Sequence, residues 1–352
     1  MRNQEARSLS CLGIGFFTLD IIVRKEQPLL DSPAFADVGG SCGNVLGILG
    51  YLGWAVAPVV RLGSDIPSRM FLQKFKALRG DLSCVVHGNG DDLPIIIEYI
   101  KSKNGVISHS FSVFNPKKGV SRFPGYRAVT LKQLEAMGIP TSKFDVVYMD
   151  RLSPSCISVA RQMSEAGSCV FVEPQRVSAE DMARVIPYAN IIKASEGKLP
   201  YIDQLRAHGS RSILIIETLG KQGLRYRLVT AARKAEEWTH LSATRHSSVV
   251  DTAGAGDWTT AGLISGRVFD AMSDTRTRLH TVIATASGWG ETSVLHPGPM
   301  GLIREVPEVS LRRILSSAVP INQYGKELKA NQAVDCWKKA SGLGDLLAKI
   351  GW

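Results

Sequence analysis

The chain has 352 residues, of which 44% are hydrophobic and 21% charged, an ordinary globular composition with room for one large domain or two smaller ones. Its formal net charge of +10 suits anionic partners, but Lys and Arg are scattered and no basic run alternates with aromatic residues, so nucleic-acid binding is not expected. Six cysteines without a CxxC pair argue against a zinc site or a disulfide framework and favour a reducing compartment.

An apolar stretch at residues 9–23 follows two arginines and superficially resembles a signal peptide. Asp20 interrupts the stretch and no small-residue cleavage site follows it, so a first β-strand is expected there instead. Nothing else approaches the ~18 uninterrupted apolar residues that a membrane span needs. We therefore expect a soluble, cytoplasmic protein without a membrane partner.

Short runs rich in Ile and Val alternate with helical segments, which is the pattern of βαβ units and a largely parallel sheet. The predicted strands are residues 10–18, 145–149, 169–172, 191–193 and 213–217. The predicted helices are one that begins just after Asn44, then residues 152–166, 259–269, 278–288 and, near the C-terminus, 331–350.

Two stretches, residues 17–35 and 94–120, alternate apolar and polar residues without an intervening helix. They predict a small antiparallel β-layer over one edge of the main sheet. The whole chain, 1–352, is expected to form a single α/β domain with a helical tail at about 300–352.

Residues 251–257 read DTAGAGD and precede an apolar-periodic run at 258–264, so a small-residue turn is expected to open a helix. The free backbone N–H groups and the positive end of the helix dipole make such a terminus an anion site. Asp257 would lie in the first turn, where a carboxylate can accept the proton of an attacking hydroxyl. A plain tight connection with a dipole-favoured Asp is an equal alternative when this segment is considered alone.

At this point the sequence resembles the ribokinase/PfkB family of carbohydrate and nucleoside kinases. The DTAGAGD segment is similar to the C-terminal signature of that family, and residues 39–44 (GGSCGN) to its N-terminal signature. Residues 61–65 (RLGSD) and 218–223 (TLGKQG) resemble two further family segments. The resemblance implies a ribokinase-like α/β fold: a central, mostly parallel sheet flanked by helices, with a small antiparallel β lid.

The resemblance also implies roles for particular residues. It makes Asp257 the catalytic base and assigns the anion hole to the amides of Gly254, Ala255 and Gly256. The implied substrate-binding residues are Asp20, Gly39, Gly40 and Asn44. From the residues alone, an exposed Asp at a strand end remains an alternative for Asp20, and a plain helix N-cap for Asn44.

For the nucleotide, the resemblance implies ATP with Mg²⁺ near Ser195, Glu196, Thr218, Gly220 and Gly223. It further implies a monovalent cation, K⁺, at Asp251. The β lid would cover the substrate and exclude water, and a homodimer through the lid is the expected assembly.

The sequence departs from the family pattern at two positions. Lys198 stands where the family usually has a Glu that helps to organise Mg²⁺, and residues 173–175 (EPQ) stand where many members have Asp-Pro-Asn. A monosaccharide acceptor is expected, with a nucleoside kinase and a catalytically weak sugar- or nucleotide-binding protein as alternatives. An already phosphorylated sugar is less favoured, because the sequence reveals no convergent cluster of Arg and Lys.

Overall fold

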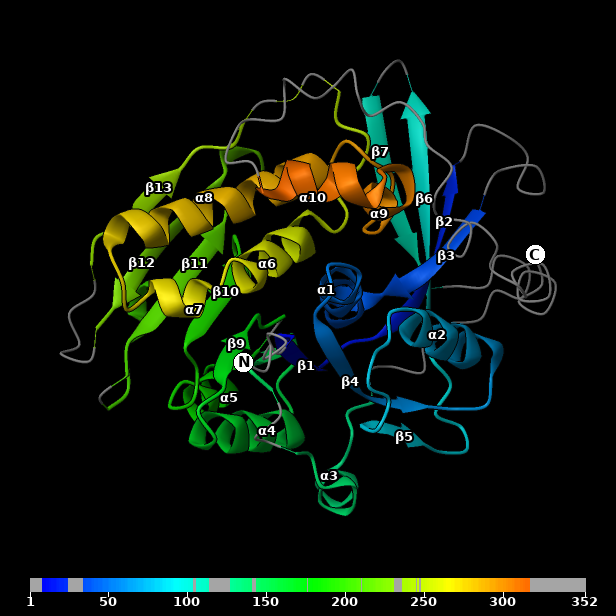
Figure 1. Ribbon diagram of the computed structural model, residues 1–352, viewed down its shortest axis with the longest axis horizontal. Coiled ribbons are helices and arrows are strands. Elements are labelled where there is room, and N and C mark those ends of the chain that lie inside the picture. Colours follow the sequence, from blue (N-terminus) through cyan, green and yellow to red (C-terminus); the bar gives the residue numbers. More distant parts are fainter. Residues whose placement is uncertain are drawn as a thin grey trace, which may run out of the picture.

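The computed structural model describes residues 8–24, 34–103, 106–113, 127–140, 144–175, 177–209, 211–230, 236–244, 246 and 248–316. Two sheets form its framework (Figure 1). The larger sheet contains, in spatial order, β13 (Thr239–Leu241), β12 (Leu224–Val229), β11 (Ile213–Thr218), β10 (Ile191–Ser195), β9 (Cys169–Val172), β8 (Val146–Met149), β1 (Ser10–Ile14), β4 (Ala55–Leu62) and β5 (Val85–His87). The smaller sheet contains β3 (Ala34–Gly39), β2 (Thr18–Arg24), β6 (Ile95–Lys103) and β7 (Val106–Ser112).

The larger sheet is parallel from β5 to β11, and its last two pairings, β11–β12 and β12–β13, are antiparallel. The helices are α1 (Gly40–Tyr51), α2 (Ile66–Ala77), α3 (Leu131–Met137), α4 (Pro154–Glu165), α5 (Ala179–Val185), α6 (Ala255–Ser265), α7 (Val268–Ala271), α8 (Arg276–Ser293), α9 (Gly301–Glu305) and α10 (Glu308–Ser316). In Figure 1, α6 and α8 lie on one face of this sheet, and α4 and α5 on the other. This is the mostly parallel α/β architecture that the sequence predicts.

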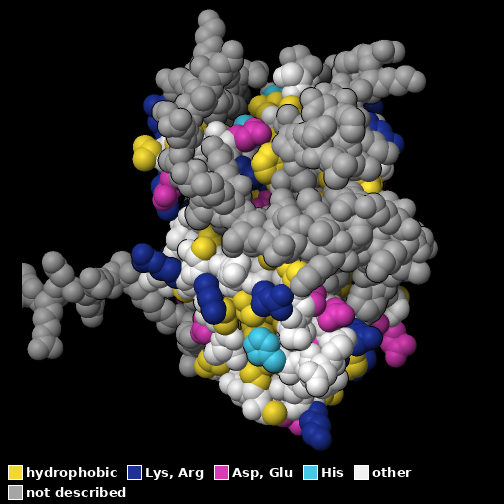
Figure 2. Space-filling model, turned by 90° about the vertical axis from the view of Figure 1, so that its right-hand side faces the viewer, with side chains coloured by type: hydrophobic (Ala, Val, Ile, Leu, Met, Phe, Trp, Pro, Cys, Tyr) yellow, Lys and Arg dark blue, Asp and Glu magenta, His cyan; other side chains and the backbone are white. Residues whose placement is uncertain are grey.

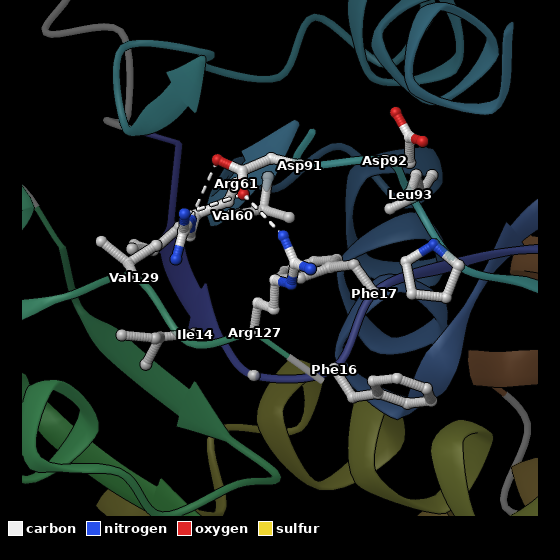
Figure 3. A pocket seen from close by; sticks show the side chains of 13 residues that line it. Ile14, Phe16, Phe17, Val60, Arg61, Asp91, Asp92, Leu93, Arg127 and Val129 are labelled. Carbon is white, nitrogen blue, oxygen red and sulfur yellow. Dashed lines mark hydrogen bonds and ion pairs between the residues drawn. The ribbon is translucent and has the colours of Figure 1, made fainter. Parts of the chain in front are cut away.

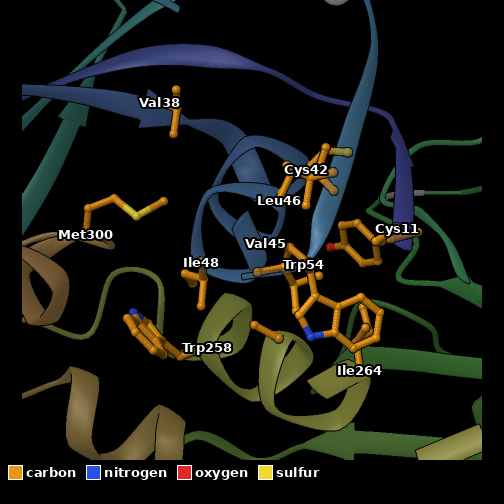
Figure 4. Close-up of a cluster of buried hydrophobic side chains, with 14 of the residues drawn as sticks. Cys11, Val38, Cys42, Val45, Leu46, Ile48, Trp54, Trp258, Ile264 and Met300 are labelled. Carbon is orange, nitrogen blue, oxygen red and sulfur yellow. The ribbon is translucent and has the colours of Figure 1, made fainter. Parts of the chain in front are cut away.

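Alternation along the strands divides the core into two layers. In β8, Val146 and Tyr148 belong to the layer that includes α1 and α6, whereas Val147 and Met149 belong to the layer that includes α4 and α5. Figure 4 shows the first layer, in which side chains of α1 lie close to the buried Trp258 of α6. The central strands are therefore apolar on both faces, as expected for a covered parallel sheet.

Most predicted strands are confirmed to within two residues, but four predicted elements have wrong boundaries. One is the helix predicted at residues 278–288, since α8 spans Arg276–Ser293. The strand predicted at residues 10–18 ends at Ile14, because the chain turns at Gly15 and enters the second sheet. A side chain at Gly15 would overlap the Asp150 carboxylate, so this turn requires glycine.

The two other wrong boundaries concern helices at the candidate site. Helix α1 begins at Gly40, so Asn44 lies inside the helix and is not its N-cap. Helix α6 begins at Ala255, four residues before the predicted start, and ends at Ser265; Arg267, with φ of +54°, separates it from α7.

The smaller sheet confirms the predicted β-layer, with a difference in one pairing. β2–β3 and β6–β7 are antiparallel, but β2 and β6 are parallel. β3 leads directly into α1, which joins the two sheets at the glycines of the N-terminal signature. The predicted helix at 331–350 lies outside the described residues.

Among the described helices, none is long and apolar enough to cross a membrane. Figure 2 shows the side of the molecule that carries α2 and β5. On the part of this face that the structure describes, Lys and Arg side chains are spread among acidic and apolar ones.

A buried charge cluster fastens the smaller sheet to the rest of the molecule. Asp37 of β3 accepts a hydrogen bond from Lys74 of α2 at 3.0 Å and pairs with Arg304 of α9. The three side chains are at most 9% exposed. The two cations hold the pKa of Asp37 below its usual range despite burial.

We predict that Asp37→Asn destabilises the protein by ~3–5 kcal/mol, because it removes the carboxylate that pairs with two buried cations. Urea unfolding at pH 7 measures this loss. In the wild type, the contribution of Asp37 is complete above the ordinary carboxyl pKa and is lost as the pH falls through the lowered pKa of the folded state. The exposed Asp274→Asn is the control and should leave the unfolding midpoint close to the wild-type value; an equal midpoint for Asp37→Asn would contradict the prediction.

Candidate active site

The DTAGAGD segment forms the predicted turn at the start of α6. Gly254 is the N-cap, with φ of +79°, and a Cβ there would lie 2.6 Å from Cα of Pro299. Glycine is therefore required by both conformation and space. Among the described residues, no backbone carbonyl accepts a hydrogen bond from the amides of Gly256 and Asp257. These donors and the helix dipole make the turn suitable for an anion.

Asp257 occupies the third position of α6 and is 9% exposed. Its carboxylate accepts a hydrogen bond of 2.7 Å from Nδ2 of Asn44 in α1, a residue 213 positions away in the chain. Burial, and secondarily the nearby Glu173, raise the pKa of Asp257 to about 7, whereas Asn44 and Lys193 act to lower it. The pKa of Asp257 is thus close to the value that suits a general base at neutral pH.

Asp251 stabilises the same turn from its other end. Its carboxylate accepts hydrogen bonds from the amide of Ala253 at 2.9 Å and from the amide of Gly298 at 2.8 Å. Trp258 makes a second contact with the segment before α9, since its indole N–H donates to the carbonyl of Pro299 at 2.7 Å. The turn is therefore held against the segment before α9 by polar contacts on both sides.

A buried ion pair beneath the turn was missed at the sequence level. Lys193 of β10 pairs with Glu173, and a Cβ placed at Gly256 would lie 3.7 Å from the Lys193 ammonium. Glu173 also accepts hydrogen bonds from Tyr148 at 3.1 Å and from Thr260 at 2.6 Å. The sequence signal was available, because a lysine within the apolar run of β10 can only point into one of the two cores.

The substrate residues implied by the N-terminal signature gather where β2, β3 and α1 meet. Asp20 is buried, so the alternative of an exposed Asp at a strand end was wrong. Its carboxylate accepts a hydrogen bond from Thr18 at 2.6 Å, and burial raises its pKa to about 7. A Cβ at Gly39 would overlap this carboxylate, and Gly40 has φ of +73°, so both glycines are required.

Asp150, which follows β8, is a further buried carboxylate that the sequence analysis did not single out. It accepts a hydrogen bond of 2.7 Å from the amide of Phe16, and burial raises its pKa to about 6. Its charge also raises the pKa of Asp257, so the two carboxylates lie in one electrostatic environment. Asp150 fixes the β1–β2 loop, whose other side contacts Gly40.

The residues implied for the nucleotide lie at the carboxyl ends of β10 and β11. Ser195 and Thr218 are direct neighbours in the parallel pairing, and the amide of Glu196 donates to the Thr218 carbonyl at 2.9 Å. Gly223 has φ of +99° and closes the turn before β12, which Gly220 opens. In open α/β sheets, ligands bind at this edge, outside the carboxyl ends of the strands.

The structure therefore brings Asn44 into contact with Asp257, and it brings Gly39 and Gly40 into contact with Asp20 and the β1–β2 loop. Ser195 and the Thr218 turn form a separate group. Lys193 lies two residues before Ser195 on the same side of β10, so it connects this group with the α6 turn.

The side chains give a partial answer about metal ions. Within the described residues, no group of three or more His, Cys, Asp or Glu could hold a metal. Glu173 is committed to Lys193, whereas Glu196 is exposed beside the expected phosphate position. Mg²⁺ commonly binds through one or two carboxylates plus substrate phosphates, and Glu196 fits that requirement.

Comparison with known proteins identifies the family. A family model described as "pfkB family carbohydrate kinase" matches residues 123–304, more than half of the chain. This chain belongs to the pfkB family of carbohydrate kinases. A fructokinase from Salmonella thompson is 30% identical over 126 residues, which cover 33% of this chain and 54% of the fructokinase. The chain thus spans about half the length of this curated relative.

Solved structures support the fold. A ribokinase from Arabidopsis thaliana, complexed with ribose and ATP, has a TM-score of 0.61 at 16% identity and covers 88% of this chain and 100% of its own. A nucleoside kinase from Burkholderia thailandensis, in complex with inosine, has a TM-score of 0.59 at 17% identity. The match covers 88% of this chain and 97% of the nucleoside kinase. The fold is therefore ribokinase-like. At sequence identities of 16–17%, the structural similarity supports a statement about the fold alone.

The Asn44–Asp257 hydrogen bond generates a prediction about pH dependence. Removing the donor in Asn44→Ala removes an interaction that favours ionised Asp257, so the pKa of Asp257 should rise further. Because only the ionised carboxylate accepts a proton, the acid limb of the kcat/KM profile should move to higher pH. Asp20 titrates in both the wild type and Asn44→Ala, so the quantity measured is the difference in the acid limb between these two profiles. An exposed Gln162→Ala variant is the control. An unmoved acid limb would show that Asn44 does not tune Asp257.

Proposed function

We propose that this protein transfers the γ-phosphoryl group of ATP to a hydroxyl group of a small sugar. The observation that carries this proposal is the buried Asp257, which lies in the first turn of α6 with a pKa near 7 beside a turn that suits an anion. A base and an anion site within one helical turn are the two parts that phosphoryl transfer to an alcohol requires.

In the proposed reaction, the acceptor hydroxyl loses its proton to the Asp257 carboxylate as its oxygen forms a bond to the γ-phosphorus. The bond from that phosphorus to the bridging oxygen of ATP breaks, and ADP leaves. The amides of Gly254, Ala255 and Gly256 stabilise the charge on the transferring group. Lys193 lies under the same turn and adds positive charge there.

The acceptor would bind on the β2–β3–α1 side. The side-chain oxygen of Asn44 is buried and has no hydrogen-bond partner in the described part of the chain, so it can accept from a sugar hydroxyl. Asp20 would accept another, and Gly39 leaves the space that the Asp20 carboxylate occupies. The smaller sheet would act as the lid that excludes water and so favours transfer over hydrolysis.

Mg²⁺ would neutralise the phosphates of ATP, and Glu196 is the side chain that fits it. Lys198 is exposed two residues further on and would contact phosphate directly. K⁺ binding at Asp251 stays a proposal, as does a homodimer through the lid.

The nucleoside alternative depends on an aromatic side chain that could stack on a base. Phe17 is buried and packs edge-on against Phe71, so it belongs to the core. Phe16 has its ring covered by Arg151 at 4.8 Å. These contacts engage Phe16 and Phe17, whereas Phe111 of β7 is 56% exposed.

The proposal predicts that Asp257→Asn lowers turnover by ~10²–10⁴ while ATP binding persists, since the variant removes one positioned base. ADP release with MgATP and a panel of sugars and nucleosides measures turnover, and calorimetry measures ATP binding. Asp274→Asn, on the exposed surface, is the matched control. Turnover that survives in Asp257→Asn would contradict the role of Asp257; binding without turnover in the wild type would support the binding-protein alternative.

A further inference from the structure

A pocket that is partly open to solvent lies beside the β1–β2 loop (Figure 3). Ile14, Val129 and Leu93 contribute apolar surface to it, and the Phe16 side chain borders one side. Arg61 and Arg127 come from segments far apart in the sequence, and both contribute to the polar wall. Such a mixture of apolar surface and a few convergent polar groups is typical of a ligand site.

One of the two arginines is fully engaged. Arg61 forms a bidentate pair with Asp91, at 2.7 Å through Nη2 and 3.1 Å through Nε. The Asp91 side chain is 3% exposed, so this pair neutralises a buried carboxylate. Arg61 is thereby fixed and keeps Asp91 in place.

Arg127 is a second cation on the same side of the pocket. Its Nη1 lies 3.7 Å from Asp91 and donates to the carbonyl of Gly90 at 2.9 Å. Within the described part of the chain, its Nε and Nη2 groups have no hydrogen-bond acceptor. The side chain is 52% exposed, so these donors are accessible from solvent.

The pocket is also lined by a second carboxylate, and a third arginine lies at its border. Asp92 also lines the pocket, but its carboxylate points away from the two arginines (Figure 3). Arg151 lies over the Phe16 ring and pairs with Asp150 at 3.4 Å. Inside the pocket, the two guanidinium groups therefore lie beside Asp91, while the Asp92 carboxylate is directed elsewhere.

We propose that this pocket binds an anionic substituent of the acceptor, a carboxylate or a phosphate, through Arg127. The inference rests on the proposed function and names its substrate class: a sugar acid or a sugar phosphate. A planar guanidinium with accessible donors binds either anion in a bidentate manner. The expectation that disfavoured phosphorylated sugars rested on the lack of a convergent Arg and Lys cluster in the sequence, whereas Arg61 and Arg127 come together in the fold.

The position of the pocket agrees with such a substrate. The carbonyl of Phe16 lies against Gly40, and its amide binds Asp150, so one short loop borders both the pocket and the proposed acceptor site. A hydroxyl at one end of the acceptor would face Asp257, and the anionic group at the other end would face Arg127.

The test compares acceptors that differ only in charge. ADP release is measured with glucose, gluconate and glucose 6-phosphate, and with fructose and fructose 6-phosphate. The proposal predicts a higher kcat/KM for an anionic member of a set than for its neutral parent, and the two kinds of anion separate a carboxylate from a phosphate site. Arg127→Ala should raise KM for that anion by ~10- to 100-fold with little change in kcat and none for the neutral sugar. Arg127→Lys should have a KM for that anion between those of the wild type and Arg127→Ala.

Arg276→Ala is the matched control, because Arg276 is 81% exposed on α8, remote from the pocket residues in sequence. Neutral sugars as the better acceptors, or an unchanged KM in Arg127→Ala, would overturn the inference and leave the proposed function standing. If no acceptor turns over, the proposed function fails, and calorimetry with gluconate and glucose 6-phosphate then decides the inference separately. Anion binding that Arg127→Ala weakens would support it, and no binding to the wild type would overturn it.

Discussion

The hydrogen bond between Asn44 and Asp257 is the contact on which the candidate active site depends. It joins two helices through residues that are 213 positions apart in the sequence, and both side chains are buried. The two family signatures meet through this bond. One brings the glycines that make room for the Asp20 carboxylate and the β1–β2 loop, and the other brings Asp257 and the turn suited to an anion.

The buried charges around this contact fall into two kinds. Lys193 with Glu173 is an ion pair, and Asp37 is shared by the two cations Lys74 and Arg304; both groups hold elements together. Burial raises the pKa values of Asp257, Asp20 and Asp150 toward neutrality, although Arg151 pairs with Asp150 at 3.4 Å. Buried carboxylates with raised pKa values are typical of a functional site.

The sequence predicted the architecture well, because the Ile- and Val-rich runs of β8 to β11 bury both faces of a parallel sheet and differ from the alternating residues of the smaller sheet. Local turns were predicted less well. The strand ending at Ile14 and the helix start at Gly40 depend on close contacts with Asp150 and Phe16, which no local pattern contains. The Arg61–Arg127 pair could not be predicted for the same reason, since tertiary folding alone brings those segments together, whereas Lys193 could have been found from its place in a buried strand.

The central claim is that the phosphoryl group passes to an alcohol and not to water. The most direct measurement is the ³¹P NMR spectrum of a reaction of the wild-type protein with MgATP and the acceptors named above. The account predicts a new phosphate ester resonance that grows in step with ADP. Inorganic phosphate in step with ADP and no new ester, or unchanged ATP with every acceptor, would contradict it.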